Sequence, residues 1–194
     1  MPDQLLTDLF IAYYDARQHK RNTLNALEFE INYEQNLLKL YQELKSGTYQ
    51  IGSSVAFVVF DPVQREIIAS PFRDRVIHHL VFNYINPIFE ALFINDSYSC
   101  RKKRGTAYGV NRTAHFIRSA SDNYYNDCFI LKLDLAGYFM SINHRILYAK
   151  IKSRLLEPND KINFDLELVL ELLRKIIFHL SLIHVSEPTR LGMI

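Results

Sequence analysis

Asp134 is the residue whose surroundings most favour a chemical role. It follows the mainly apolar stretch Phe129–Leu133, and Gly137 and two aromatic residues come soon after it. A carboxylate at the end of a strand, beside an open turn, can hold a divalent cation against the phosphates of a substrate. The same position also suits an aspartate that caps a helix or a turn, and spacing alone favours this second interpretation.

A second candidate is a run of four cations, Arg101 to Arg104, directly before Gly105 and the start of an expected helix. Phosphates suit both these cations and the free N–H groups at a helix start. Tyr98 and Tyr108 flank the run, and aromatic rings can stack on bases. The pattern favours nucleic-acid binding over a solvated basic loop. The residues expected to bind are Lys102, Lys103, Arg104 and Arg112.

Composition adds a few limits. The chain has 194 residues, 48% of them hydrophobic, and a net charge of +2. It can therefore bury a core, and global disorder is excluded. The stretches 97–121 and 135–156 contain bases but no acids, which suits local contact with a polyanion. Two cysteines make no disulfide framework, and no signal peptide or bilayer-length apolar run is present, so we expect a cytoplasmic protein with no membrane contact.

The elements that must position these residues form an α+β pattern. Apolar periodicity predicts helices over 5–13 and 24–44, the second stopped by Gly47. The triplet Arg73-Asp74-Arg75, near the start of the helix expected from Pro71, suggests only ion pairs between neighbouring side chains. The remaining elements expected are a hairpin of 55–60 and 65–68 around Asp61-Pro62, a helix from Pro71 to Tyr84 broken by Pro87, a helix over 106–119, a strand over Phe129–Leu135, a turn at Gly137, and helices over 144–155 and 163–179.

The last fifteen residues look foreign to the rest of the chain. Leu180–Arg190 resembles the translation of a transposon-end adapter used to prepare sequencing libraries, and Leu191–Ile194 would then be flanking adapter. We therefore expect 180–194 to be a non-native tail, and we leave it out of the functional argument. The alternative is a natural helix end followed by a Ser-Glu-Pro-Thr loop.

Several blocks, in this order, resemble a reverse transcriptase of the bacterial group-II-intron-like branch, closest to the enzymes of diversity-generating retroelements. The resemblance covers about residues 10–179, and its more specific blocks are Asp-Arg-Val-Ile-His-His and Tyr-Ser-Cys-Arg. The blocks are Phe57–Ile67, Phe72–His79, Pro87–Glu90, Asp96–Arg101 with Gly105-Thr106, and Leu131–His144. The resemblance implies a right-hand polymerase fold with fingers and an incomplete palm.

The resemblance also implies roles for single residues. Arg65 would grip the triphosphate of the incoming nucleotide, and Arg101 would face the template and nascent base pair. Asp134 would be the first palm aspartate and bind both catalytic Mg²⁺ ions, with the Leu135 carbonyl near the same metal. Phe139 would lie under the sugar and disfavour a 2′-hydroxyl. The reaction would be nucleotidyl transfer assisted by two metal ions.

The chain departs from the family in four respects. Ala136 stands where relatives usually carry Lys, Asn143 where Asp is common, and Val63-Gln64 lacks the frequent lysine before the arginine. The aromatic-x-Asp-Asp motif, which supplies the other metal ligands, does not occur in the sequence. We therefore expect the intact parent to be an RNA-directed DNA polymerase and this chain to be an inactive fragment of it.

The implied partners are a template RNA, a DNA primer or cDNA, deoxynucleoside triphosphates and a small basic accessory protein. The implied segments are a helical N-terminal part (1–50), fingers (51–125), the first part of the palm (126–179) and the tail (180–194). Two alternatives stay open: a non-catalytic nucleic-acid-binding module, and a related defence-associated polymerase. Without its sheet neighbours, the strand Phe129–Leu135 should expose an apolar edge and lower solubility.

Overall fold

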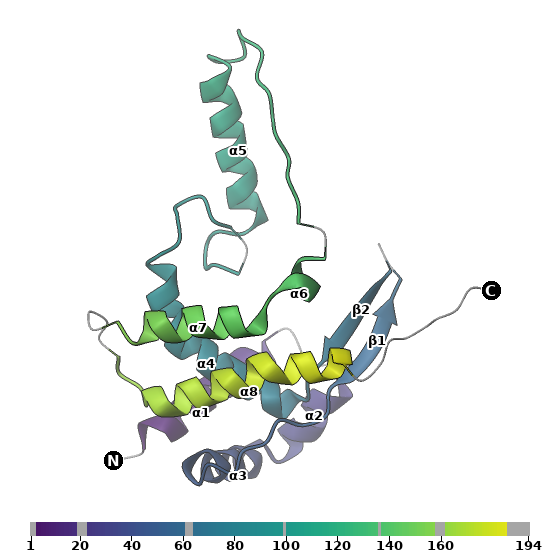
Figure 1. Cartoon of the computed structure of the whole chain (residues 1–194), viewed down its shortest axis with the longest axis vertical. Coiled ribbons are helices and arrows are strands. Elements are labelled where there is room, and N and C mark those ends of the chain that lie inside the picture. The colour runs from purple at the N-terminus through teal and green to yellow at the C-terminus, as the bar shows by residue number, and fades with distance from the viewer. Residues whose placement is uncertain are drawn as a thin grey trace, which may run out of the picture. The chain divides into compact units, whose positions relative to one another are not determined.

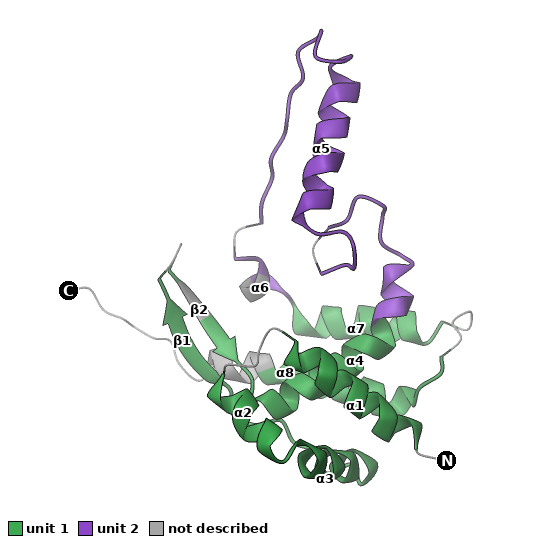
Figure 2. Cartoon of the chain, turned by 180° about the vertical axis from the view of Figure 1, so that it is seen from behind, with its two compact units in different colours: residues 1–85, 143–194 green, residues 86–142 purple. Residues whose placement is uncertain are grey.

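The computed structural model describes residues 3–18, 23–60, 64–98, 100–135, 137–157 and 162–185. These residues form two compact units, which Figure 2 colours separately. Unit 1 comprises residues 1–85 and 143–194, and unit 2 comprises residues 86–142. The segment bounds expected from the sequence, at residues 50, 125 and 179, stay a prediction.

Unit 1 contains most of the helices and one small sheet (Figure 1). Its helix α7 packs along α8, and α1 packs on α3. Its elements are α1 (Gln4–Arg17), α2 (Leu24–Ile31), α3 (Tyr33–Lys45), β1 (Val55–Val59), β2 (Arg65–Ala69), most of α4 (Phe72–Glu90), α7 (His144–Leu155) and α8 (Leu166–Val185). The mixture is a helix-rich α+β fold, as the sequence predicted at this coarse level.

The single helix expected over residues 24–44 was wrong, because the chain forms two helices there. Asn32 leaves the helical conformation, with φ −128° and ψ 40°, and separates α2 from α3. The Asn36 side-chain amide donates to the Phe29 carbonyl at 2.9 Å, which gives that carbonyl a partner at the end of α2. Apolar periodicity continues through such a break, so periodicity alone does not detect it.

Gly47 ends α3 as predicted. Its φ of +68° lies in the left-handed region that glycine adopts without strain. The Gly47 N–H donates to the Leu44 carbonyl and the Thr48 N–H donates to the Glu43 carbonyl, at 3.2 and 2.9 Å. This is the hydrogen-bond pattern of a Schellman motif, which gives partners to carbonyls at the helix end.

The predicted hairpin is confirmed. Strands β1 and β2 pair antiparallel, with Val55 opposite Ala69 and Val59 opposite Arg65. The turn expected at Asp61-Pro62 lies outside the described residues. Phe57 and Val58 remain 46% and 39% exposed, so the hairpin is held mainly by its own pairing and not by a covering layer.

Helix α4 begins after Pro71 as predicted, but Pro87 does not break it. The helix continues to Glu90 and contains the proline within its last turn. A proline there removes one hydrogen bond near the helix end, a smaller disturbance than in the middle of the helix. The prediction that the helix stops at Tyr84 was therefore wrong by about one and a half turns.

The core of unit 1 lies where α1, α3, α4 and α8 meet. Tyr13 is at its centre and stacks on Tyr33 with ring centroids 5.0 Å apart, and the ring of Phe72 meets it edge-on at 6.2 Å. Burial of such aromatic and aliphatic surface is the main force holding these helices together. The other fully buried side chains of these helices include Leu9, Leu37, Leu40, Val76, Ile77, Leu80, Val169 and Leu172.

Unit 2 contains the end of α4, helix α5 (Thr106–Ala120) and the short helix α6 (Tyr138–Ser141). Helix α5 confirms its prediction, and Gly137, at φ +59°, makes the expected turn before α6. The strand expected over Phe129–Leu135 is not formed, because a strand needs a neighbour and the described sheet contains only β1 and β2.

The C-terminal helix α8 begins at Leu166, three residues later than expected, and its backbone runs to Val185. Of the expected non-native tail, residues 186–194 lie outside the described part of the chain. None of the helices in that part combines the length and apolar character needed to cross a membrane.

Candidate nucleic-acid interface

Arg101 is enclosed by its own loop. Its side chain is 7% exposed, and its guanidinium contacts the Glu90 carboxylate at 2.8–2.9 Å. The same group donates to the carbonyls of Ile94 and Ser97, both at 2.9 Å. These bonds close the loop between α4 and the basic run, so Arg101 organises the loop, and its contact with a base pair stays a prediction.

Arg112 is held by Asp96 through two parallel hydrogen bonds of 2.7 and 2.9 Å. The Tyr98 hydroxyl donates to the same carboxylate at 2.7 Å. The bonds from Arg112 and Tyr98 lower the pKa of Asp96 from 3.8 to about 2. Arg112 is therefore neutralised in place, and it joins α5 to the loop before the basic run.

Arginines alternate with aromatic rings throughout unit 2. Each of four arginines lies over a ring, with 4.6–6.0 Å between the guanidinium carbon and the ring centroid. The pairs are Arg101 with Phe93, Arg104 with Tyr108, Arg112 with Phe116, and Arg118 with Tyr124. Planar cations and rings are the two kinds of group on which unpaired bases stack.

Lys102 and Lys103 are exposed and, within the described residues, have no ion-pair partner. Lys103 has a φ of +62°, which turns the chain sharply just before α5. Arg104 donates to the Asn95 carbonyl and thus continues the loop closure made by Arg101. The two lysines therefore carry positive charge that no carboxylate of the described residues neutralises, and phosphate is the group they suit.

An open groove of about 540 Å³ runs along α5, and its lining includes Gly105, the residue that directly follows the basic run. Small residues, Gly105 and Gly109, form part of its lining, and the Tyr98 ring lies across from Gly109. Val110, Ala114 and Ile117 add apolar surface, and two threonines complete the lining. A largely apolar groove can take the faces of bases, and the basic run that precedes Gly105 in the chain could contact the backbone of the same strand.

Asp134 lies in the exposed segment that leads to α6. Its carboxylate accepts a hydrogen bond from the adjacent Leu135 N–H at 2.9 Å, its one hydrogen bond among the described residues. Three or more His, Cys, Asp or Glu side chains that could hold a metal do not come together anywhere in the described ranges. Asp134 and the Leu135 carbonyl can thus supply metal ligands, but not a complete metal site.

The other two predicted residues are placed by their backbones only. Arg65 begins β2, opposite Val59, and belongs to unit 1. Phe139 lies in α6, directly after the turn at Gly137. The structure thus brings Arg101, Arg104 and Arg112 together in one unit through shared loop contacts, whereas Arg65 belongs to the other unit.

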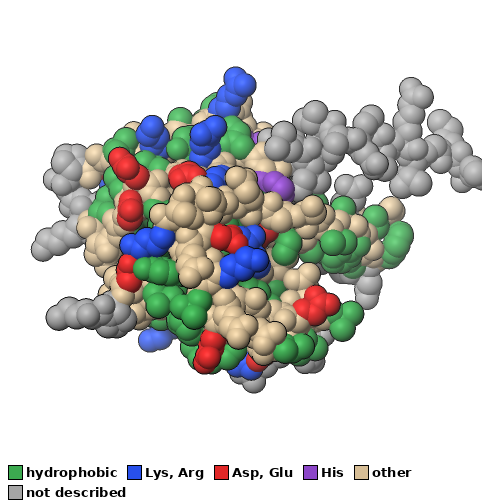
Figure 3. All heavy atoms as spheres, turned by 90° about the horizontal axis from the view of Figure 1, so that it is seen from below, with side chains coloured by type: hydrophobic (Ala, Val, Ile, Leu, Met, Phe, Trp, Pro, Cys, Tyr) green, Lys and Arg blue, Asp and Glu red, His purple; other side chains and the backbone are tan. Residues whose placement is uncertain are grey.

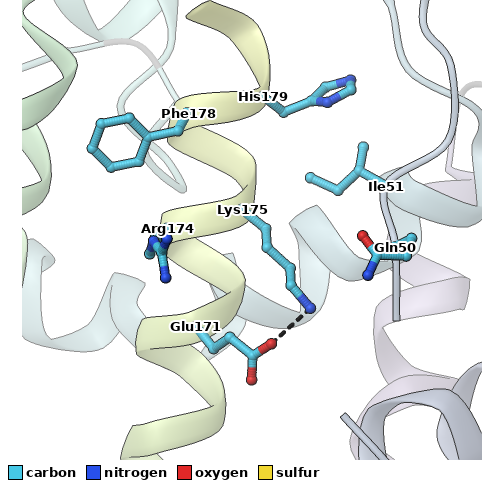
Figure 4. A pocket seen from close by; sticks show the side chains of 7 residues that line it. All are labelled: Gln50, Ile51, Glu171, Arg174, Lys175, Phe178 and His179. Atoms are coloured by element: carbon cyan, nitrogen blue, oxygen red, sulfur yellow. Dashed lines mark ion pairs between the residues drawn. The ribbon is translucent and has the colours of Figure 1, made fainter. Parts of the chain in front are cut away.

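A second pocket, of about 680 Å³, lies in unit 1 between α8 and residues 50–51 (Figure 4). Lys175 points across it, pairs with Glu171 at 2.6 Å and donates to the Tyr49 carbonyl at 2.7 Å. The pocket therefore contains charges of both signs. The negative charge of Glu171 reduces the attraction of Lys175 for a phosphate. On the face of the molecule drawn in Figure 3, basic and acidic side chains are likewise interspersed.

A polar cluster around Asp74, next to this pocket, was not predicted from the sequence. Asp74 is fully buried and accepts hydrogen bonds from the Tyr49 hydroxyl at 2.9 Å and from the Gly52 N–H at 2.8 Å. Arg73 pairs with Glu43 and lies over the Tyr49 ring. The local pairing predicted for Arg73-Asp74-Arg75 is present between Arg73 and Asp74, at 3.8 Å. The other partners of Arg73 and Asp74 lie more than twenty residues away, and no local signal points to them.

Comparison of the chain with models of known protein families and with curated protein sequences finds no match.

Proposed function

We propose that this chain is the fingers and first palm segment of a right-hand polymerase that copies template RNA into cDNA. The observation that carries the proposal is the exposed Asp134 carboxylate, three residues before the left-handed turn at Gly137 and the helix that contains Phe139. The ordered blocks that resemble reverse transcriptases support it, as do the cations and rings of unit 2. In the intact enzyme, Asp134 and the Leu135 carbonyl would be among the ligands of Mg²⁺, which would supply the positive charge that nucleotidyl transfer requires.

Each residue has a distinct part in this proposal. Asp134 and the Leu135 carbonyl would contribute ligands to the metal, and Arg65 would bind the triphosphate. Lys102 and Lys103 would contact the template backbone, since their charges are not neutralised within the described residues. Arg101 would act at the base pair and hold the loop that presents the two lysines.

The chain by itself is not expected to polymerise. One carboxylate cannot hold two metal ions, and the described residues provide no larger group of ligands. This observation favours a second candidate function, a non-catalytic module that binds single-stranded nucleic acid through the groove along α5. The two candidates share the cations of unit 2 and differ in whether Asp134 is needed.

Primer extension separates the two candidates. The gene would be read from its source DNA beyond the codon for His179, expressed in full, and assayed with an RNA template and a DNA primer. We expect extension by the parent and its loss in Asp134→Asn, with activity kept in the matched control Asp122→Asn. An open reading frame without further metal carboxylates, or Asp134→Asn with full activity, would contradict the polymerase proposal.

Nucleic-acid binding by the chain itself is tested with a fluorescent single-stranded RNA at several salt concentrations. Replacing Lys102 and Lys103 with Ala should weaken binding and reduce the slope of log K against log salt by about 0.7 for each phosphate that the protein no longer neutralises. Lys39→Ala, an exposed lysine on α3, is the control and should change neither quantity. Equal effects of the two changes would show that binding is not located at the basic run.

A further inference from the structure

Most residues of the segment from residue 127 to residue 135 are apolar, and all of its residues except Cys128 are exposed. Phe129 is 95% exposed, and Leu131 and Leu133 are each 81% exposed. Within the described part of the chain, the backbone of residues 127–135 forms no hydrogen bond to another backbone group. Exposed apolar side chains together with unpaired backbone groups are the properties of a strand that has no neighbour.

The sequence of this segment suits one side of a sheet. In an extended conformation, Leu131, Leu133 and Leu135 lie on one face, and Lys132 and Asp134 lie on the other. Pairing with a second strand would satisfy the backbone and bring the leucines of both strands onto one apolar face. The segment therefore needs a partner strand whose charges complement Lys132 and Asp134.

The same segment of a second copy meets this need in an antiparallel arrangement centred on Leu133. Lys132 then lies opposite Asp134 of the second copy, and Asp134 lies opposite its Lys132, so both charges are paired at once. Leu133 faces Leu133, and Leu131 faces Leu135 of the second copy. Opposite charges directly across a pair of strands are stabilising, and like charges are destabilising.

Neighbouring arrangements lose this complementarity. An antiparallel pairing centred on Lys132 places lysine against lysine, and a parallel pairing in register places both kinds of charge against their like. A pairing that slips by one residue sets each charge opposite an apolar side chain. The charges therefore select one register, with two-fold symmetry.

We propose that the 194-residue chain forms a two-fold symmetric dimer by antiparallel pairing of residues 131–135 with the same residues of a second copy. The proposal goes beyond the proposed polymerase function and does not rest on it. In this dimer Asp134 is engaged by Lys132 and not by a metal ion, so the two roles of the carboxylate exclude each other at any one time. Failure of either proposal leaves the other standing.

Sedimentation velocity over a range of protein concentrations tests the charge pairing. The unmodified chain should show a monomer–dimer equilibrium. Lys132→Asp alone and Asp134→Lys alone each set like charges opposite each other, and each should raise the dimer dissociation constant about tenfold or more. An equimolar mixture of the two variants should dimerise again, because every charge then faces its opposite in the mixed dimer.

Cysteine crosslinking tests the register. In a chain with Cys100→Ser and Cys128→Ser, Leu133→Cys places two thiols across the symmetry axis, within the range that a disulfide spans. Leu131→Cys places them several residues apart, where no disulfide can form. We expect oxidation to link the first variant into dimers and not the second.

The altered side chains are exposed, so we expect every variant to fold. Circular dichroism checks that each variant keeps its helical signal. A chain that stays monomeric at all concentrations would overturn the proposal. So would association that ignores the charge reversals, or equal crosslinking at positions 131 and 133. Particles larger than a dimer, if they persist when the two charge-reversal variants are mixed, would show that the segment associates without a defined register. That result would also overturn the proposal.

Discussion

Asp74 is a fully buried carboxylate that joins segments distant in the chain. Asp74→Ala removes the acceptor for the Tyr49 hydroxyl and the Gly52 N–H, and leaves both donors unpaired. We expect the free energy of unfolding to fall by about 3 kcal/mol, as for other broken buried pairs. Urea denaturation measures it. Tyr49→Phe, which removes one donor, should cost only about 1 kcal/mol. Equal losses in the two variants would contradict this account.

Two histidines on α4, His78 and His79, should make the free energy of unfolding depend on pH. Burial lowers the pKa of His78 below 6.5, against the opposing charge of Asp74, and burial also lowers the pKa of His79. A lowered histidine pKa means that the folded state favours the neutral ring, so stability is complete above pH 6.5 and is lost as the pH falls through the folded pKa values. Urea denaturation at a series of pH values should show this loss.

The control for the pH effect is the exposed His115 on α5. The double variant His78→Gln and His79→Gln should flatten the pH dependence, whereas His115→Gln should leave it unchanged. An unchanged slope in the double variant would assign the effect to other groups.

At the scale of single residues, the charged side chains of unit 2 could be predicted from the sequence, but their partners could not. The run Arg101–Arg104 was evident from composition, and its loop contacts with Glu90 and Asn95 were not. Tyr49 carried no signal at all, because its importance comes from Asp74, far away in the chain. Residue type is a local property, whereas burial and pairing depend on which segments meet in the fold.

At the scale of elements, predictions succeeded where a local group decides the outcome. Gly47 ends α3 through its own left-handed conformation, and alternation of side chains identified the hairpin. Predictions failed where the neighbourhood decides. The segment 129–135 has strand-like residues but no described strand beside it, and Asn32 interrupts an otherwise continuous helical pattern.

Two glycines allow a matched test of backbone conformation. Gly47→Ala forces a Cβ into the left-handed region, and it should lower the free energy of unfolding by about 1 kcal/mol. Gly109→Ala lies inside α5, where the new Cβ meets Tyr98 at an ordinary 3.7 Å. This change should stabilise α5 by about 0.5–1 kcal/mol. Thermal unfolding followed by circular dichroism measures both, and a loss at Gly109 equal to that at Gly47 would contradict the assignment.

At the scale of the whole molecule, the two units differ in how they are stabilised. Every buried hydrophobic residue of the described chain belongs to unit 1. Unit 2 is held by ion pairs and hydrogen bonds instead, such as Arg101 with Glu90 and Arg112 with Asp96. Partly exposed ion pairs, such as Arg112 with Asp96, contribute little to stability, whereas a buried apolar core contributes most of it.

Hydrogen exchange should reveal this difference directly. Helix α5 has no buried residue, whereas α3, of similar length, buries Leu37, Leu40 and Leu44. Because amides exchange through local opening, and opening costs least where little apolar surface becomes exposed, those of α5 should exchange well before those of α3. Mass spectrometry of peptides from 106–120 and 33–45 compares the two. Equal protection of the two peptides would mean that interactions from outside unit 2 stabilise it. The first candidate is the pairing of residues 131–135 with a second copy of the chain. In that case, dilution of the protein should dissociate the dimer and lower the protection of α5.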